Sequence, residues 1–225
     1  MHRARARIEA FTLEMTGKPA IRIACERRLI PNPGQAIMAL LPGTDQSIRH
    51  VMFPVHIDDG GFIADMVPDR RWRLGDELDL LGPIGHGFSP PRSARRWLLA
   101  ALGQYPSRLL PLLDLGLAGG AALSFYVDQP LPGLPPQVEV TTDLTEAMKW
   151  ADYLAIEVAA EDLSQLRTRF SLSPDDQIPI PAQALISMPM PCGIGTCQAC
   201  AVKARRGWKL SCNDGPVFNL SALEW

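Results

Sequence analysis

Four of the five cysteines in this chain lie close together near its C-terminus, between residues 192 and 212. Cys192, Cys197, Cys200 and Cys212 have the spacing C-x4-C-x2-C-x11-C. Thiolates in such a group can ligate zinc or an iron–sulfur cluster, pair as disulfides, or act as a redox-active thiol pair. The spacing helps to discriminate among these chemistries.

Zinc and iron–sulfur sites differ in how their cysteines follow one another along the chain. Zinc sites usually present two ligand pairs, each C-x2–4-C, separated by a longer loop. Here the first three cysteines are neighbours and the fourth stands alone, an order that matches plant-type [2Fe–2S] ligand runs. The x11 interval is shorter than a plant-type ferredoxin would lead us to expect. We expect all four cysteines to hold a [2Fe–2S] cluster, with zinc or free thiols as alternatives.

Glycines and basic residues accompany the cysteines. Gly193 and Gly195 suit a loop that brings backbone N–H groups close to sulfur and needs positive φ angles. Trp208 either shields the cluster from solvent or packs as an ordinary core residue. Four basic residues either offset the negative charge of the cluster or belong to a solvated hairpin: Lys203, Arg205, Arg206 and Lys209.

The composition is that of a globular chain of 225 residues, with 47% hydrophobic and 20% charged residues. The net charge of −2 gives no support for nucleic-acid binding, which needs a basic face. The sequence has no apolar run near the roughly 18 residues of a membrane span. The Arg-rich N-terminus lacks the apolar stretch of a secretory signal. We therefore expect a reducing, cytoplasmic location, in which clustered cysteines ligate metals rather than form disulfides.

The first 90 residues contain short runs of β-branched and apolar residues separated by Gly- and Pro-rich turns, which indicates a sandwich or barrel. Six strands are expected, at residues 7–15, 20–30, 36–42, 49–57, 61–67 and 76–82. Cys25, within the second, is expected to be a buried small hydrophobe rather than a reactive thiol.

From residue 91 the pattern changes to strands that alternate with helices, which indicates a parallel α/β domain. Strands are expected at 95–103, 122–129, 137–143 and 152–159, and helices at 105–120, 145–151 and 161–170. Pro111 fits poorly inside the first helix, which should end at Gly119 and Gly120. Residues 171–183 are expected to be a polar, Pro-rich connector to the cysteine module.

Several segments resemble the electron transfer subunits of class 1B dihydroorotate dehydrogenase. They are MPCGIGTCQACAVKA and GWKLSCNDGPVFNL in the cysteine module, PNPGQAIMALLPG, and RLGDELDLLGPIGHGF. The resemblance implies a ferredoxin-reductase-like protein in which a barrel holds FAD, a Rossmann-like domain takes NAD(H), and a [2Fe–2S] module faces a flavin-containing catalytic subunit. Electrons then pass between dihydroorotate and NAD through both flavins and the cluster.

Both the pattern and the resemblance predict a β + α/β fold in three parts. We expect an N-terminal antiparallel β-barrel at residues 1–90, a shortened Rossmann-like parallel α/β domain at 91–183, and a small C-terminal [2Fe–2S] module at 184–225.

The sequence departs from the family at the FAD-binding positions. The family's flavin strand carries Arg-Pro-x-Ser, whereas residues 47–57 read SIRHVMFPVHI, with Arg49 in place and Pro54 or Val55 at the serine. The family's Gly-x-Gly-Thr phosphate turn is replaced by VPDRRWRLG at 67–75. Three arginines of that segment supply charge without the turn's geometry: Arg70, Arg71 and Arg73.

The NAD-binding positions differ as well. The Gly-rich nucleotide loop is replaced by LGQYPSRLL at 102–110, where Gly103 is the one glycine left and Tyr105 and Pro106 obstruct close approach. The Cys-Gly-Pro segment that should follow residues 152–158 is absent. We therefore do not expect NAD and leave FAD open as a second cofactor beside the [2Fe–2S] cluster.

We predict an electron-transfer subunit that passes electrons through the cluster to or from a dihydroorotate dehydrogenase-like flavoenzyme or another redox protein. The alternative is a non-catalytic binding or regulatory protein that keeps the cluster as a structural staple or redox sensor. The sequence nominates no catalytic residue, so turnover by the chain itself stays undecided.

Overall fold

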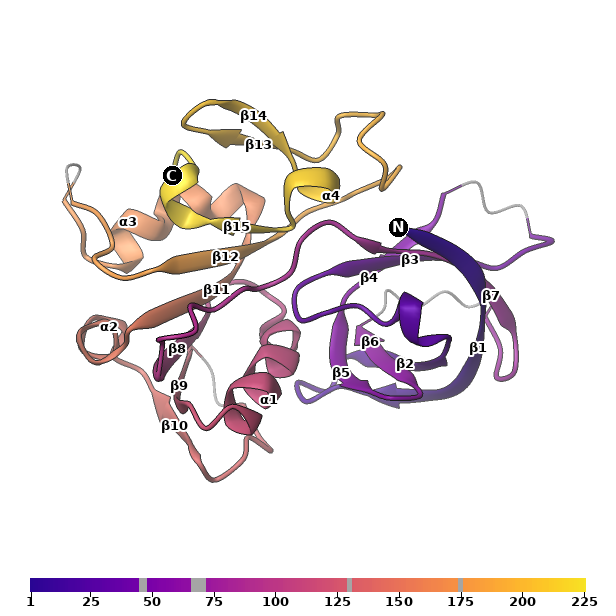
Figure 1. The fold of residues 1–225 in the computed structure, drawn as a ribbon, viewed down its shortest axis with the longest axis horizontal. Helices are drawn as coiled ribbons and strands as arrows, with labels where there is room; N and C mark the ends of the chain where they lie inside the picture. Colours follow the sequence, from indigo (N-terminus) through magenta and orange to yellow (C-terminus); the bar gives the residue numbers. More distant parts are fainter. Residues whose placement is uncertain (45–47, 66–71, 129–130, 174–175) are drawn as a thin grey trace.

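The structure is a computed structural model that describes residues 1–44, 48–65, 72–128, 131–173 and 176–225. Two sheets lie side by side, and the C-terminal segment lies beside the junction between them (Figure 1). None of the described helices is long and apolar enough to cross a membrane.

The N-terminal sheet is an antiparallel barrel in the order β4-β3-β7-β1-β2-β6-β5. Alternate apolar side chains point inward, among them Ile8, Ile21, Phe62 and Leu80, and these are fully buried. Its strands are β1 (His2–Leu13), β2 (Pro19–Ala24), β3 (Ala36–Leu40), β4 (His50–Met52), β5 (Pro54–Asp58), β6 (Gly61–Asp65) and β7 (Glu77–Ile84), with a 3-10 turn η1 (Arg27–Leu29).

The strand expected at 49–57 is two strands, because the chain changes partners at Phe53. The residues before it pair with β3 at one end of the sheet, and those after it pair with β6 at the other end. The Phe53 N–H donates to Asp65 Oδ1 at 2.8 Å, and the Asp65 N–H donates to the Phe53 carbonyl at 3.0 Å. This single segment therefore joins the two ends of the sheet into a barrel.

The second sheet has the order β10-β9-β8-β11-β12-β15, with the first five strands parallel and β15 antiparallel. The central strands β8 and β11 are apolar almost throughout, as strands covered on both faces must be. The strands are β8 (Arg96–Ala101), β9 (Ala122–Val127), β10 (Val138–Thr141), β11 (Tyr153–Ala159), β12 (Ala182–Ser187) and β15 (Val217–Asn219).

Helical segments connect these strands where the sequence predicts them, but the helices expected at 105–120 and 161–170 each begin as a 3-10 turn. The segment expected as one helix at 105–120 is a 3-10 turn, η2 (Pro106–Leu109), followed by α1 (Leu110–Ala118). Pro111 lies in the first turn of α1, where a backbone N–H would have no hydrogen-bond partner within the helix, so the missing N–H costs nothing. The remaining helices are α2 (Leu144–Trp150), η3 (Ala160–Gln165) and α3 (Leu166–Arg169).

The C-terminal segment shares the second sheet rather than standing apart from it. β12 begins in the last two residues of the expected connector and continues into the expected cysteine module, so the boundary between residues 183 and 184 falls inside a strand. The chain then forms the hairpin β13 (Ala201–Ala204) and β14 (Gly207–Leu210) and the short helix α4 (Ser211–Asp214). It returns as β15 on the edge of β12 and ends after η4 (Leu220–Ala222). The predicted fold class, an antiparallel barrel followed by a Rossmann-like α/β sheet and a small C-terminal module, is confirmed.

Candidate iron–sulfur centre and the interdomain network

The four cysteines come together as two pairs. Cys200, which precedes β13, and Cys212, in α4, are buried, and their Sγ atoms lie 3.3 Å apart. Cys192 is half-buried and Cys197 is exposed, and the Cys197 N–H points at Cys192 Sγ with an N···S distance of 3.5 Å. We call Cys200, directly before β13, and Cys212, in α4, the inner pair. Cys192 and Cys197, earlier in the same loop, are the outer pair.

The two pairs have different electrostatic surroundings. Backbone N–H groups of Cys197, Ile194 and Thr196 face the Cys192 sulfur and lower the pKa of its thiol to about 6. Burial, together with the neighbouring Cys200 thiol, raises the pKa of Cys212 to about 12. The Cys192 sulfur is thus stabilised as a thiolate by backbone N–H groups, whereas the buried Cys212 thiol holds its proton more tightly.

Thiolate ligands suit zinc and iron–sulfur clusters alike. The structure brings the four cysteines together as two pairs. A [2Fe–2S] cluster spreads four thiolates over two irons. The cysteine donor set therefore fits this group.

The loop glycines have the predicted backbone conformations, and Gly193 also lies close to a neighbour in the barrel. Gly193 has φ +65° and Gly195 has φ +78°. A Cβ on Gly193 would overlap the sulfur of Met38 in β3, so this glycine lets the cysteine loop pack against the barrel. Gln198 also adopts a positive φ, +58°, which the sequence did not predict.

The family-like segments at 31–43 and 73–88 meet the cysteine module directly. The His86 N–H donates to the Gly215 carbonyl, and Gln35 Nε2 donates to the Gly85 carbonyl at 2.8 Å. Gly85 has φ +68°, and a Cβ there would overlap the Gly215 carbonyl oxygen. The three separate sequence matches thus form one junction, which positions Cys212 against the barrel.

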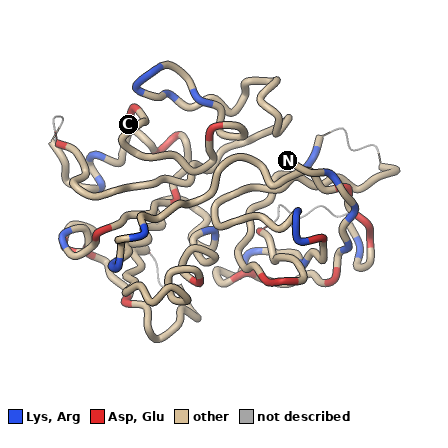
Figure 2. Tube along the Cα trace, viewed as in Figure 1, with Lys and Arg blue, Asp and Glu red and all other residues tan. Residues whose placement is uncertain are grey.

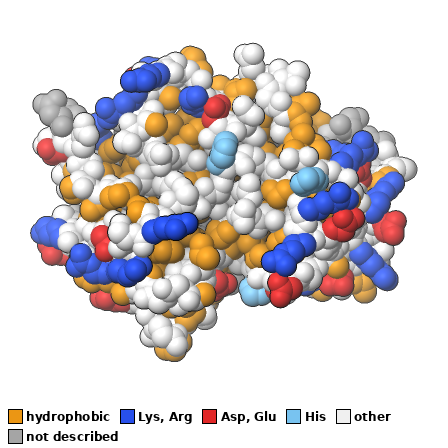
Figure 3. All heavy atoms as spheres, viewed as in Figure 1, with side chains coloured by type: hydrophobic (Ala, Val, Ile, Leu, Met, Phe, Trp, Pro, Cys, Tyr) orange, Lys and Arg blue, Asp and Glu red, His pale blue; other side chains and the backbone are white. Residues whose placement is uncertain are grey.

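The basic residues of the module lie on the solvated hairpin. Lys209 pairs with Asp214 at 3.2 Å and Lys203 with Glu224 at 2.8 Å. The hairpin carries a band of basic side chains at the upper left of the molecule (Figures 2 and 3). Trp208, on β14, is 67% exposed, so it does not pack in the core, which was one of its two expected roles.

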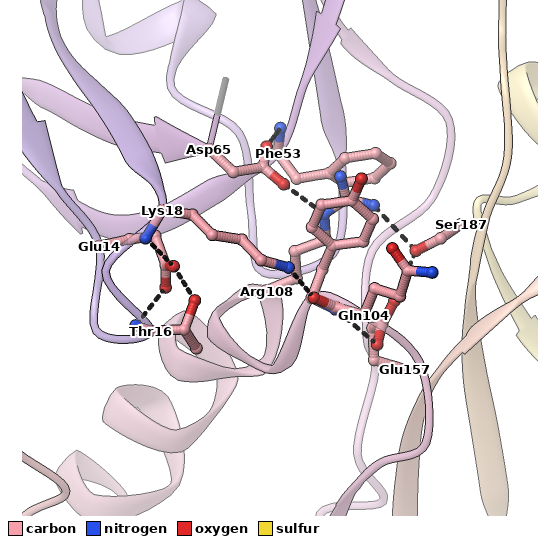
Figure 4. A network of polar contacts seen from close by, with 10 residues as sticks. Glu14, Thr16, Lys18, Phe53, Asp65, Gln104, Arg108, Glu157 and Ser187 are labelled. Atoms are coloured by element: carbon pink, nitrogen blue, oxygen red, sulfur yellow. Dashed lines mark hydrogen bonds and ion pairs between the residues drawn. The ribbon is translucent and has the colours of Figure 1, made fainter. Parts of the chain in front are cut away.

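A second polar cluster, here called the interdomain network, lies between the barrel and the α/β sheet (Figure 4). Arg108, in η2, donates from Nε to Asp65 Oδ2 at 2.5 Å and from Nη1 to Ser187 Oγ at 2.8 Å. Its guanidinium carbon lies 4.2 Å from the centre of the Phe53 ring and 3.8 Å from the centre of the Tyr105 ring. One planar cation is thus held by two aromatic rings, a carboxylate and a hydroxyl.

Glu157, on β11, completes the network from the α/β side. It accepts from Ser187 Oγ at 2.6 Å and from the Tyr105 N–H at 3.3 Å. Burial raises its pKa, while Ser187 and Arg108 act in the opposite direction. A Cβ on Gly103, the one glycine of the segment 102–110, would overlap this carboxylate. Glu157 therefore fills the space beside Gly103.

The turn between β1 and β2 contacts the loop at residues 102–110, which follows β8. Glu14 accepts from the N–H groups of Thr16 and Lys18 at 2.9 and 3.0 Å. Burial raises the pKa of Glu14, but these hydrogen bonds outweigh it and hold the pKa below its usual value. Lys18 donates to the Gln104 carbonyl, and its Nζ lies 4.5 Å from the centre of the Tyr105 ring. A hollow of about 730 Å³ remains beside this turn at the carboxyl ends of β8 and β9.

Comparison with known proteins identifies the family. The model of the iron–sulfur cluster binding domain of dihydroorotate dehydrogenase B matches residues 188–224. A putative dihydroorotate dehydrogenase B (NAD(+)), electron transfer subunit, from Thermotoga maritima is 50% identical over 230 aligned positions, which cover 95% of this chain and 98% of the relative. The chain belongs to this family of electron transfer subunits. A Clostridium perfringens member is 24% identical over 220 positions, covering 86% of this chain and 87% of its own.

Solved structures share the fold of this electron transfer subunit family member at low sequence identity. The NADH-dependent reduced ferredoxin-NADP oxidoreductase matches with a TM-score of 0.74 and 17% identity, covering 99% of this chain and 90% of that chain. Phthalate dioxygenase reductase matches with a TM-score of 0.59 and 12% identity, covering 91% and 87%. The ferredoxin-reductase-like fold implied by the resemblance is therefore confirmed.

The interdomain network lies where this family member departs from its family's cofactor motifs. Phe53 belongs to the segment aligned with the flavin strand, and Tyr105 and Arg108 belong to the segment that replaces the nucleotide loop. Arg49 is held by Asp79 of β7, with Nη2 to Oδ2 at 2.7 Å. Arg70 and Arg71 lie outside the described residues. Arg108 and the two rings that flank it therefore occupy part of the space between the barrel and the sheet, beside the hollow already described and a second one of about 520 Å³ between Val55 of the barrel and Asp114 of α1.

Proposed function

We propose that this chain is an iron–sulfur electron-transfer subunit in which Cys192, Cys197, Cys200 and Cys212 hold a [2Fe–2S] cluster. The observation that supports this assignment is the arrangement of the four thiols in two pairs, inside the segment that matches the family's cluster-binding domain. When bound, the cluster accepts and releases one electron at a time. In this proposal the cluster module carries the electron, and the barrel and the α/β sheet hold the module in place.

The chain's own residues control how that charge is stabilised. N–H groups of the 194–197 loop face the Cys192 sulfur and favour the more negative, reduced state. Burial of Cys200 and Cys212 keeps water from the inner side. Exposed Cys197 places the outer side at the surface, where electrons enter or leave.

The partner we propose is a flavin-containing catalytic subunit of the dihydroorotate dehydrogenase type, which docks over the outer pair. Two large apolar side chains of the cluster module are exposed: Ile194 by 55%, between the first two ligands, and Trp208 by 67%. Exposed aromatic and aliphatic groups of this kind serve as anchors in protein interfaces. We place the complex in the reducing cytoplasm, where the thiols stay available as ligands.

The cluster assignment is tested by purifying the protein anaerobically and counting iron and acid-labile sulfide in one sample. We expect about two of each per chain and a visible spectrum that dithionite bleaches reversibly. Cys197→Ser should change that spectrum and lower the iron content. Cys25→Ser is the matched control, because Cys25 is in the barrel and burial raises its pKa to about 11. Zinc in place of iron, or a Cys197→Ser spectrum identical to wild type, would contradict the assignment.

A regulatory protein that keeps its cluster as a staple or redox sensor is the second candidate, because Arg108 and its flanking rings occupy part of the space between the barrel and the sheet. A reduced chain that reoxidises on mixing with the catalytic subunit, while that subunit becomes reduced, favours the transfer subunit. Reoxidation by air alone favours the sensor.

A further inference from the structure

We propose that Arg108 occupies the flavin position permanently and that this chain carries electrons through its cluster alone, without FAD or NAD. The interdomain network connects the positions at which the family's cofactor motifs are replaced. Phe53 comes from the flavin strand, Tyr105 and Arg108 from the nucleotide loop, and Glu157 from the strand before the missing Cys-Gly-Pro segment. Side chains of the two domains contact one another where the family places a cofactor between them.

Arg108 is suited to replace a flat ring. Its guanidinium is planar and stacks on aromatic faces, and here it lies within 4.2 Å of two ring centres. Its side chain is 10% exposed and that of Asp65 is 9% exposed. The slot between barrel and sheet is therefore filled by a paired, stacked cation.

Moving Arg108 aside would not create a good site for FAD. Asp65 and Glu157 would remain as buried carboxyl groups without their cation, and burial of unpaired charge is strongly unfavourable. Asp65 is also fixed in place, because it accepts the Phe53 N–H at 2.8 Å. FAD carries two phosphate charges, so acids left without their cation would oppose its binding, whereas a neutral flavin ring escapes this repulsion.

The backbone donors that a phosphate-binding loop needs are already used. The N–H groups of Leu102 and Gly103 donate to the Glu157 carbonyl at 2.9 and 3.0 Å. The Tyr105 N–H donates to the Glu157 carboxylate at 3.3 Å. A Gly-rich loop instead turns such groups outward to a pyrophosphate. These three N–H groups are therefore not available to a dinucleotide in the hollow beside β8 and β9.

The electron route is then restricted to one-electron steps. A chain without flavin cannot split the electron pair of a hydride donor, so its donor and its acceptor must each exchange single electrons with the cluster. This consequence rests on the proposed function, whereas the absence of flavin stands by itself and is measured separately.

The first experiment counts iron, sulfide and released flavin in one anaerobic sample of the full chain. We expect a full cluster, less than about 0.1 flavin per chain, reduction by dithionite, and no reduction by NADH with or without added FAD. FAD at 100 µM should leave Tm unchanged, since a ligand at a hundredfold excess over its Kd would raise Tm by about 5–10 °C. One flavin per chain, or such a rise, would overturn the proposal. Missing iron would instead overturn the cluster assignment.

A second experiment asks whether Arg108 fills the slot. Lumiflavin, a neutral flavin ring without phosphates, should bind Arg108→Ala and not wild type, as measured by quenching of its fluorescence. Arg169→Ala is the matched control, because Arg169 pairs with Asp128 on the surface at 2.9 Å. Equal binding to wild type and Arg108→Ala would show that the slot is open without the substitution and would refute the role of Arg108. If Arg108→Ala does not fold, the flavin count on wild type decides.

Discussion

Replacing Arg108 with methionine removes the positive charge between the two domains while keeping most of the side chain's length. Arg108 and Asp65 form an ion pair in which each side chain is about nine-tenths buried. Removing one partner of a buried pair costs about 3–5 kcal/mol, because the other charge stays buried without compensation. For a chain of this size each kcal/mol lowers Tm by about 2–4 °C. The expected fall in Tm is therefore about 6–20 °C.

The assay is thermal unfolding of the anaerobic protein, with the visible spectrum recorded beforehand to show that the cluster is retained. Arg169→Met is the control, since Arg169 and Asp128 are 39% and 45% exposed. An exposed pair contributes about 0.2–1 kcal/mol, so the control should lose no more than about 4 °C. Adding Asp65→Asn to Arg108→Met should recover part of the loss, because the stranded charge is removed and the amide oxygen still accepts the Phe53 N–H. Equal falls for Arg108→Met and Arg169→Met would refute the network as the link between the domains.

Two further predictions concern pH and the cluster junction. Burial raises the pKa of Glu157 in the folded chain, while Ser187, Arg108 and the Tyr105 N–H lower it. The folded state therefore holds this proton more tightly, and stability present at low pH is lost as pH rises from about 4.3 through the folded pKa. The Tm of Glu157→Gln minus that of wild type should grow between pH 5 and 8 in matched melts, and a constant or shrinking difference would contradict this sign. Gly85→Ala should lower both Tm and iron per chain because its Cβ would overlap the Gly215 carbonyl oxygen. Gly43→Ala is the control, because Gly43 has φ +78° and nothing within 4 Å of the added Cβ. Backbone strain should lower its free energy of unfolding by only about 1–2 kcal/mol, and its iron content should stay that of wild type. Equal iron loss in both variants would show that the junction is not responsible.

The cysteine spacing predicts the candidate cluster site because the ligands, except Cys212, lie close together in the sequence. The positive φ angles of Gly193 and Gly195 are local properties too, and the structure confirms these angles. The structure adds that Gly193 packs against Met38, more than 150 residues earlier in the chain. Local patterns identify such a glycine but do not reveal its neighbour, since the neighbour depends on the tertiary fold.

The elements that the sequence missed are those whose partners decide their form. β12 follows a Pro-rich stretch and reads as part of a connector, yet it pairs with β11 on one side and β15 on the other. The break at Phe53 separates two strands because each half pairs with an opposite end of the barrel. In both cases burial between neighbouring strands overrides the local signal.

The interdomain network shows how a change at the loop reaches the rest of the molecule. Arg108 bonds to Asp65, 43 residues before it, and to Ser187, 79 residues after it, so no local pattern predicts these contacts. One signal was available, the arginine directly before the apolar run of residues 109–113, because a buried cation requires an acidic partner. Where a Gly-rich loop would leave room for a phosphate, Tyr105 and Arg108 supply side chains that bind the barrel directly. The residues of this loop therefore provide contacts between the barrel and the α/β sheet, and these contacts join the two parts of the fold beside the cysteine module.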